Sequence, residues 1–302
     1  MIALSDNVRG AIYMMLSMAG FVLNDTLMKS LADTLPMFQA IFIRGLFATA
    51  LIGVLAWYRR ALWFRPCTTT SKVISLRVIG ELGATIFFIT ALFNMPIANA
   101  TAILQVSPLA VTLGAALFLG EAVGWRRYSA IIVGFLGVLL IVRPGSDGFT
   151  VYSVYALAAV AFFVLRDLVT RRLPPDVPSL FVTVISSFAV MVMAGFLTLP
   201  IPWQAMTLSQ VAILALAAIF VLVGYFFGVM TMRVGEIGFV SPFRYTILIW
   251  AILLGFFVFD DIPDLLTLVG SAVVVLTGLY AFYRERQLIK GRDRHATATA
   301  RS

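Results

Sequence analysis

Long apolar segments separated by short polar breaks account for most of the chain. A helix needs about 20 mostly apolar residues to cross a bilayer, and apolar windows of this kind recur throughout the sequence. The pattern therefore predicts an all-α membrane protein with ten transmembrane helices, of which the fifth is short. The predicted spans are residues 10–30, 37–58, 73–93, 98–120, 128–143, 151–172, 179–199, 209–232, 237–259 and 265–284.

The composition agrees with helices that lie in lipid. Hydrophobic residues make up 61% of the 302 residues and charged residues only 12%, whereas a globular domain carries roughly 25% charged residues. The single cysteine, Cys67, excludes an intrachain disulfide and a cysteine-based metal site. The single histidine, His295, lies in a polar tail, which excludes histidine-based catalysis inside the membrane. We expect no metal site and no cofactor.

The basic residues predict the orientation of the helices. With the N-terminus inside, 17 of the 22 lysines and arginines fall in cytoplasmic segments, above all in the loop from Arg59 to Arg77 and in the tail from Arg284. The positive-inside rule then places both termini in the cytoplasm. The formal net charge of +8 is thus an orientation signal, and nucleic acid is not an expected partner.

Two similar segments indicate that the chain arose by duplication. Phe-Val-Leu-Asn-Asp-x-x-x-Lys-x-Leu at residues 21–31 recurs as Phe-Val-Leu-Arg-Asp-x-x-x-Arg-x-Leu at residues 163–173, an offset of 142. Each copy places a carboxylate, Asp25 or Asp167, inside an apolar helix. Repeats of this kind, with an ionisable group at the same position, are typical of membrane transporters.

A second repeated motif fits the same duplication. Val-Ser-Pro in the predicted fourth helix, residues 106–108, recurs in the ninth, residues 240–242. Each half then holds five helices, and an odd number inverts the second half in the membrane. We therefore expect two inverted five-helix repeats, residues 1–145 and 148–286, joined by Arg-Pro-Gly-Ser-Asp-Gly. The basic tail, residues 287–302, is expected to be disordered.

Several of these features resemble the EamA family of the drug/metabolite transporter (DMT) superfamily. They are the two five-helix halves, the prolines of the fourth and ninth helices, and the Phe-Leu-Gly-Glu of residues 118–121. The resemblance spans residues 10–284, although the second half reads Phe-Asp-Asp at residues 259–261. Ser-Pro-Phe-Arg-Tyr at residues 241–245, with Trp250, is similar to YddG-type exporters of aromatic and other hydrophobic amino acids. The resemblance implies export.

Charged residues inside the predicted spans are the first candidates for a functional site. Such groups cost a few kcal/mol unless they face a partner or a water-filled cavity. Asp25 and Arg44 lie at similar depths in the outer halves of the first two helices. The simplest interpretation is a structural Asp25–Arg44 ion pair, and the alternative is a substrate or proton site.

Four further charged residues lie in the inner half of the membrane. Glu81, Arg166, Asp167 and Arg244 either neutralise one another or change partners as a cytoplasmic gate opens. Adjacent helical residues project about 100° apart, so Arg166 and Asp167 are not expected to face one partner. Arg171, one turn after Asp167, is the expected partner of that carboxylate. Arg166 and Arg244 then remain to face a cavity.

Other polar residues and two prolines complete the candidate substrate cavity. Pro108 and Pro242 each free a backbone carbonyl one turn upstream, which needs a partner or a cavity in a membrane. A simple helix kink is the alternative. The residues expected to line the cavity are Arg244, Tyr245, Ser241, Gln105, Asn99, Asn94, Tyr225 and Arg166.

Other classes of protein fit the sequence less well. Asp-Asp-Ile-Pro-Asp at residues 260–264 spells a magnesium–diphosphate motif of prenyl-transfer enzymes. It occurs once, however, and on the predicted outer side. A channel would need a ring of like charges or a filter loop, and an ATP-driven pump would need a Gly-x-x-x-x-Gly-Lys-Ser/Thr loop. The sequence has neither.

The sequence therefore predicts a secondary transporter and no enzyme. Its expected substrates are small hydrophobic or amphipathic metabolites, including aromatic amino acids, moved outward by alternating access. Facilitated diffusion or exchange is favoured over proton coupling. Export of another metabolite or drug of the same superfamily is the alternative function. The expected partners are a small-molecule substrate and the lipid bilayer, with a monomer favoured over a dimer.

Overall fold

A computed structural model describes residues 5–120, 124–144, 150–234 and 237–299 of the chain. Side chains are described in these ranges except at 127, 232–233, 237–238 and 284–299. The described residues do not include Glu121, the central part of the linker between the predicted halves, or the last three residues.

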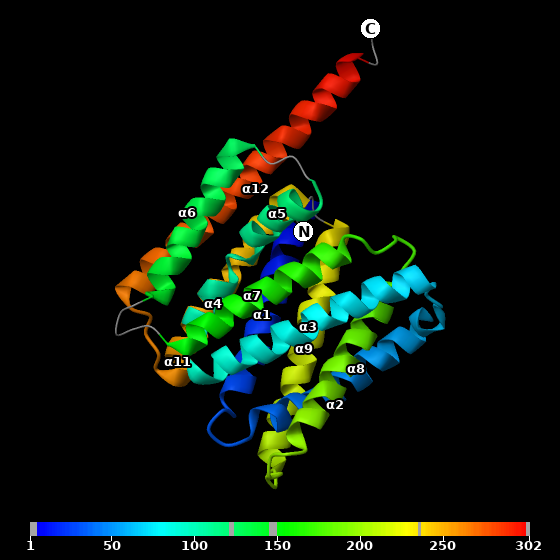
Figure 1. The fold of residues 1–302 in the computed structure, drawn as a ribbon, viewed down its shortest axis with the longest axis vertical. Helices are drawn as coiled ribbons and strands as arrows, with labels where there is room; N and C mark the ends of the chain where they lie inside the picture. The colour runs from blue at the N-terminus through cyan, green and yellow to red at the C-terminus, as the bar shows by residue number, and fades with distance from the viewer. Residues whose placement is uncertain (1–4, 121–123, 145–149, 235–236, 300–302) are drawn as a thin grey trace.

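The described chain folds into α-helices and two short 3-10 helices, η1 and η2 (Figure 1). Nine helical stretches of this part are long and apolar enough to cross a membrane, and the apolar part of α6, Tyr128–Val142, is shorter. This confirms the prediction of an all-helical membrane protein with a short fifth span. The elements are α1 Asp6–Lys29, α2 Met37–Tyr58, η1 Ala61–Trp63, α3 Thr68–Asn94, α4 Ile97–Leu104, α5 Ser107–Phe118, α6 Trp125–Val142, α7 Val151–Thr170, α8 Ser179–Thr198, α9 Leu208–Val234, α10 Ile237–Val240, η2 Ser241–Tyr245, α11 Thr246–Phe259 and α12 Leu265–Thr299.

Two of the spans are interrupted at their prolines. The fourth is broken into α4 and α5, and Pro108 stands in the first turn of α5. The ninth is broken into α10, η2 and α11, and Pro242 stands in the first turn of η2. Proline lacks the N–H that would continue the helix through this point. Both residues thus mark a break in a span.

Two helix boundaries differ by five residues or more from those that the sequence predicts. α3 begins at Thr68 instead of residue 73, because the polar Thr-Thr-Thr-Ser-Lys stretch forms its first turn. α12 continues to Thr299, where the sequence indicated a disordered tail from residue 287. Residues 284–290 are mostly Arg, Glu, Gln, Leu and Lys, which are strong helix formers, so they extend a helix that is already nucleated.

The most extensive helix–helix contacts join elements that are far apart in the sequence. α1 packs on α9, α2 on α8, α3 on α7 and α6 on α12, as Figure 1 shows. α4 likewise contacts α11. Each of these contacts joins a helix from the first part of the chain to one from the second part. The core of the molecule is therefore built between the two parts rather than within either one.

Glycines allow the closest of these contacts. A Cβ atom at Gly20 of α1 would lie 2.9 Å from the backbone nitrogen of Gly224 in α9. A Cβ atom at Gly80 of α3 would lie 2.9 Å from the backbone nitrogen of Arg166 in α7. Small residues let helix backbones approach in this way inside membranes. The second contact brings α3 next to a charged residue of α7.

Two aromatic pairs occupy matching places in these contacts. Tyr13 of α1 packs on Phe227 of α9 with ring centroids 5.7 Å apart. Tyr155 of α7 packs on Phe87 of α3 with ring centroids 5.8 Å apart. Tyr13 and Tyr155 are separated by 142 residues, the offset of the repeated segments. The contact of α1 with α9 thus has a counterpart in the contact of α7 with α3.

Polar contacts join the helices at the end of the bundle that carries the α1–α2 connection, called the α1–α2 end below. Gln39 of α2 donates from Nε2 to the carbonyl oxygen of Gln204 over 2.7 Å and accepts from the Gln204 N–H over 3.1 Å. Lys29 at the end of α1 donates to the carbonyl oxygens of Leu92 and Met95 over 3.1 and 2.7 Å. These bonds link four segments of the chain.

Asp264 makes a further contact at the same end, between α6 and α12. Its carboxylate accepts hydrogen bonds from Arg143, at the end of α6, and from the backbone N–H of Thr267 over 2.8 Å. The second bond caps the start of α12. The hydrogen bond from Arg143 is the main cause that lowers the pKa of Asp264 to about 2. Asp264 thus joins the two helices as a fixed negative charge.

Candidate functional site

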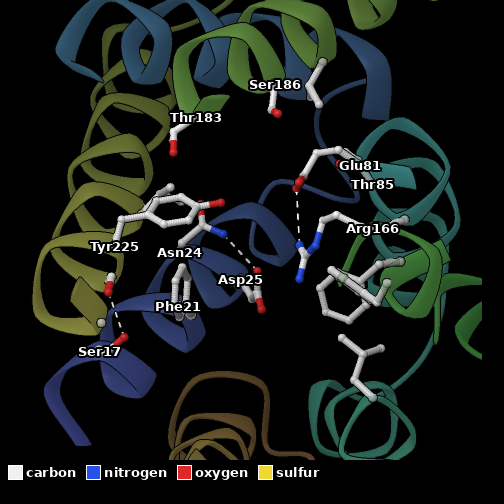
Figure 2. A pocket seen from close by; sticks show the side chains of 18 of the residues that line it. Ser17, Phe21, Asn24, Asp25, Glu81, Thr85, Arg166, Thr183, Ser186 and Tyr225 are labelled. Atoms are coloured by element: carbon white, nitrogen blue, oxygen red, sulfur yellow. Dashed lines mark hydrogen bonds and ion pairs between the residues drawn. The ribbon is translucent and has the colours of Figure 1, made fainter. Parts of the chain in front are cut away.

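A cavity of about 460 Å³ lies between the helices of both parts of the chain (Figure 2). Its walls come from α1, α2, α3, α4, α5, α7, α8, α9, η2 and α11. The lining residues run from Met14 to Asp25 on α1 and from Thr183 to Val190 on α8. The cavity therefore lies in the middle part of the bundle, away from the helix ends.

The lining is largely apolar, with aromatic rings and a set of charges. Phe21, Phe88 and Phe163 supply rings from three helices. The charges are four arginines and three carboxylates, so they nearly cancel. The charged residues are Arg44, Arg77, Arg166, Arg244, Asp25, Glu81 and Asp167.

Arg166 of α7 holds two of the three carboxylates. Its Nη1 lies 3.5 Å from Oε1 of Glu81 on α3, and its Nη2 lies 2.9 Å from Oδ1 of Asp167. The guanidinium also lies over the Phe163 ring, 4.6 Å from the ring centroid. The close approach at Gly80 places Glu81 within reach of Arg166. Two acidic groups of the cavity are thereby neutralised in place.

Arg77 of α3 extends this cluster to α8. Its Nη1 lies 3.7 Å from Oε2 of Glu81, one helical turn along. Nε donates to Thr170 Oγ1 over 3.0 Å, and Nη1 donates to Ser186 Oγ over 2.6 Å. Its side chain is only 14% exposed. Arg77 therefore joins α3, α7 and α8 beside the cavity.

Asp25 and Arg44 do not form the direct ion pair that the sequence suggested. Among the described residues no ion pair joins them; Asn24 stands between them instead. Arg44 Nη1 donates to Asn24 Oδ1 over 3.2 Å, and Asn24 Nδ2 donates to Asp25 Oδ1 over 2.8 Å. Arg44 Nε is buried without a hydrogen-bond partner. Asn24 therefore connects Arg44 to Asp25, but as a neutral amide it does not balance the negative charge of Asp25.

Asp167 has an arginine partner that the sequence interpretation set aside. Arg171 was expected to bind Asp167, and the neighbouring Arg166 was set aside because adjacent side chains diverge on a helix. Arg166 donates from Nε to Asp167 Oδ1 over 2.9 Å. The Cβ atoms of the two adjacent residues point in different directions, but the long side chain of Arg166 bends back far enough to reach Asp167.

The structure brings together half of the predicted cavity-lining residues. Gln105, Tyr225, Arg166 and Arg244 line the cavity, as do the predicted charge-pair residues Asp25, Arg44, Glu81 and Asp167. Gln105 is only 6% exposed, and its Nε2 has no hydrogen-bond partner.

The other four candidates lie outside the cavity lining. Tyr245 packs against Phe282 of α12, with ring centroids 6.3 Å apart. Asn94 is exposed and donates to the carbonyl oxygen of Thr90 over 2.7 Å. Asn99 is half-buried, and Ser241 is buried. The sequence could not assign these polar residues to a face of their helices.

Sequence reasoning also missed several lining residues. Arg77 was counted with the basic cytoplasmic loop, although it falls inside the predicted 73–93 span and inside α3. Asn24 was recognised only as the counterpart of Arg166 in the repeat. Thr183, Ser186 and Ser187 line the cavity from one face of α8. Their spacing of three or four residues was the available signal for this face.

The acidic segment at residues 260–264 does not form a metal site. No group of three or more metal-ligating side chains that could hold an ion occurs among the described residues. Asp264 is instead engaged with Arg143 and caps α12. Through these contacts Asp264 has a structural role at the α1–α2 end of the bundle.

Removing the charge of Arg166 should destabilise the fold. In an Arg166→Leu variant, Asp167 loses its arginine and Glu81 keeps only Arg77, so two partly buried carboxylates become under-compensated. We expect a loss of about 3 kcal/mol, measured as a lower Tm of the purified protein in detergent. Arg65→Leu, which removes an exposed arginine outside the cavity, is the control. Equal Tm values for the two variants would show that the cluster contributes nothing to stability.

Comparison with known proteins identifies the class of this chain. Residues 8–143 match the model of the EamA-like transporter family. One crystal structure superposes with a TM-score of 0.64 at 20% sequence identity, covering 91% of this chain and 98% of that chain. This likeness shows the fold alone.

Several curated proteins are similar along most of their length. An S-adenosylmethionine uptake transporter of Rickettsia prowazekii is 23% identical over 94% of this chain and 96% of its own. A riboflavin transporter of Vibrio cholerae is 27% identical over 89% and 91%. The pseudopaline exporter CntI of Pseudomonas aeruginosa is 28% identical over 88% and 93%.

Two of these relatives are named as transporters and the third as an exporter, and none is named as an enzyme. The family match covers the first half of the chain, and the similarity to the transporters extends over the second half as well. The chain is therefore a multi-pass membrane transporter for a small molecule, and its residues 8–143 match the EamA-like transporter family.

Proposed function

We propose that this protein is a secondary transporter that moves small amphipathic metabolites outward across the bacterial inner membrane by alternating access, and that amino acids, including aromatic ones, are among them. The observation that carries the proposal is the cavity between the two parts of the chain. It combines aromatic walls with charges that nearly cancel. Such a lining suits a molecule that has an apolar body and both signs of charge.

The two halves would form an inverted repeat that exchanges two conformations. The helix contacts support this proposal. If each helix of the first half is exchanged for its counterpart in the second, the contact of α1 with α9 becomes that of α7 with α3, while α2–α8 and α6–α12 map onto themselves. The matching tyrosine–phenylalanine pairs follow the same exchange. A two-fold axis in the membrane plane generates this pattern.

The described conformation would be open toward the cytoplasm. The distribution of lysine and arginine supports a cytoplasmic location of both termini, so that the α1–α2 end faces outward. At the opposite, outer end the Gln39–Gln204 and Lys29 hydrogen bonds hold the helices together. Outward release would require these bonds to break.

The substrate and the direction of transport rest on different observations. The relatives are named for S-adenosylmethionine, riboflavin and pseudopaline, and the first and last of these contain amino-acid groups. Outward transport rests on the resemblance of the 241–245 segment to amino acid exporters. The cavity is complete within one chain, which supports a monomer as the working unit. Facilitated diffusion or exchange is the proposed mode.

The orientation can be tested with Cys67, the only cysteine of the chain. This residue is exposed just before α3, and a hydrogen bond with Thr70 lowers the pKa of its thiol, which favours the reactive thiolate. A membrane-impermeant maleimide should therefore label Cys67 in permeabilised spheroplasts but not in intact ones. Equal labelling of intact and permeabilised spheroplasts would place this loop outside.

The transport activity can be tested in liposomes with a panel of radiolabelled amino acids and related metabolites. Protein-dependent counterflow of phenylalanine or another amphipathic amino acid is expected, without accumulation when only a pH gradient is imposed. Correctly folded protein that moves none of the panel would contradict the proposed function. Accumulation driven by the pH gradient would instead show proton coupling.

A further inference from the structure

The three carboxylates of the cavity are not equivalent. Glu81 has two arginine partners and Asp167 has one. Asp25 has none among the described residues, and its only described side-chain partner is the neutral amide of Asn24, at 2.8 Å. That amide is itself held by Arg44 through its oxygen. Asp25 is therefore the cavity carboxylate whose charge is not balanced by a direct cation.

The position of Asp25 makes this imbalance relevant to a ligand. Asp25 lines the cavity, and Figure 2 shows its side chain bonded to that of Asn24 and outside the Glu81–Arg166 ion pair. Its Oδ1 is occupied by Asn24. An ionised carboxylate offers about four acceptor positions on its two oxygens. A donor that enters the cavity can therefore bind Asp25 without displacing Asn24.

Aromatic rings stand next to this carboxylate. Phe21 lies one helical turn before Asp25 on α1 and also lines the cavity. It meets the ring of Tyr225 on α9 edge to face, with centroids 5.4 Å apart. Aromatic rings attract cations as well as apolar groups. Asp25 and these two rings, called the Asp25 subsite below, combine one negative charge with aromatic surface.

We propose that the Asp25 subsite binds the ammonium group of the transported substrate. The proposal rests on the proposed function and narrows its substrate class to amine-bearing amphipathic molecules. An ammonium group supplies the missing positive charge and up to three hydrogen-bond donors. The aromatic or aliphatic body of the substrate then packs against Phe21 and Tyr225.

The paired cluster indicates which carboxylate of the cavity an amine should bind. Glu81 and Asp167 would have to give up arginine contacts to bind a cation, whereas Asp25 would not. Charge-assisted hydrogen bonds are roughly twice as strong as neutral ones, so losing such contacts is unfavourable. An amine should consequently select Asp25 over the other two carboxylates.

Equilibrium binding to the full-length protein in nanodiscs tests this assignment. The probes are 2-phenylethylamine, which carries only the ammonium group, its neutral analogue 2-phenylethanol, phenylalanine, and 3-phenylpropanoate, which carries only the carboxylate. The wild-type protein should bind 2-phenylethylamine about tenfold or more tightly than 2-phenylethanol. This comparison needs no variant and stays informative if substitution harms folding.

The variant Asp25→Asn then assigns the preference to one residue. It should weaken the binding of phenylalanine and 2-phenylethylamine by about tenfold or more, while 3-phenylpropanoate binding changes by less than about twofold. Asp25→Glu, which keeps the charge, should retain part of the amine preference. Asp33→Asn makes the same substitution at an exposed residue outside the cavity and should leave all affinities unchanged.

The possible failures are distinguishable. Any one of three results would overturn the inference. The wild-type protein could bind 2-phenylethylamine and 2-phenylethanol equally, or it could bind neither 2-phenylethylamine nor phenylalanine. The third result is an Asp25→Asn variant that keeps its preference for the amine. An equal loss for all four probes would also overturn it, because that result indicates a structural role. Preserved amine selectivity together with no transport in liposomes would contradict the proposed function and leave the Asp25 subsite supported.

Discussion

Neutralisation of charge inside an apolar helix bundle is the constraint on which this structure depends. Arg166 sits in α7 among apolar neighbours, and its position is tolerable because Glu81 and Asp167 face it at 3.5 and 2.9 Å. A charge at this depth costs several kcal/mol without a partner. Because Arg166 needs acidic partners, α3 must pack against α7. Gly80 lets the two backbones come close enough for Glu81 to reach Arg166.

The same constraint separates two kinds of charge in the cavity. The Arg77–Glu81–Arg166–Asp167 cluster is balanced within itself and joins three helices. Among the described residues, Asp25 and Arg44 are connected through the amide of Asn24. The two similar segments differ at this point, since Asn24 and Arg166 stand at equivalent positions. The segment in α7 contributes to the cluster, and the segment in α1 holds the carboxylate that we propose as a ligand site.

The sequence was sufficient for the properties that depend on hydropathy and local motifs. The helical membrane fold and the short fifth span followed from apolar windows, and the transporter class followed from the resemblance of several motifs to a known family. The helix faces did not follow, because transmembrane helices are apolar all round and their packing decides which side meets the cavity. Tyr245 was misplaced for this reason, since it packs on α12. Arg77 was missed because it was counted with the basic loop before α3, although it falls inside the predicted 73–93 span.

The central claim is that the cavity opens alternately as the outer contacts break and re-form. Gln39→Cys and Gln204→Cys, introduced together in a Cys67→Ser background, place a cross-link where the two glutamines now bond. The most direct measurement is counterflow in liposomes with this pair oxidised and then reduced, against the two single-cysteine variants. The account predicts that oxidation arrests transport and that reduction restores it. Undiminished transport by the fully cross-linked protein would contradict it.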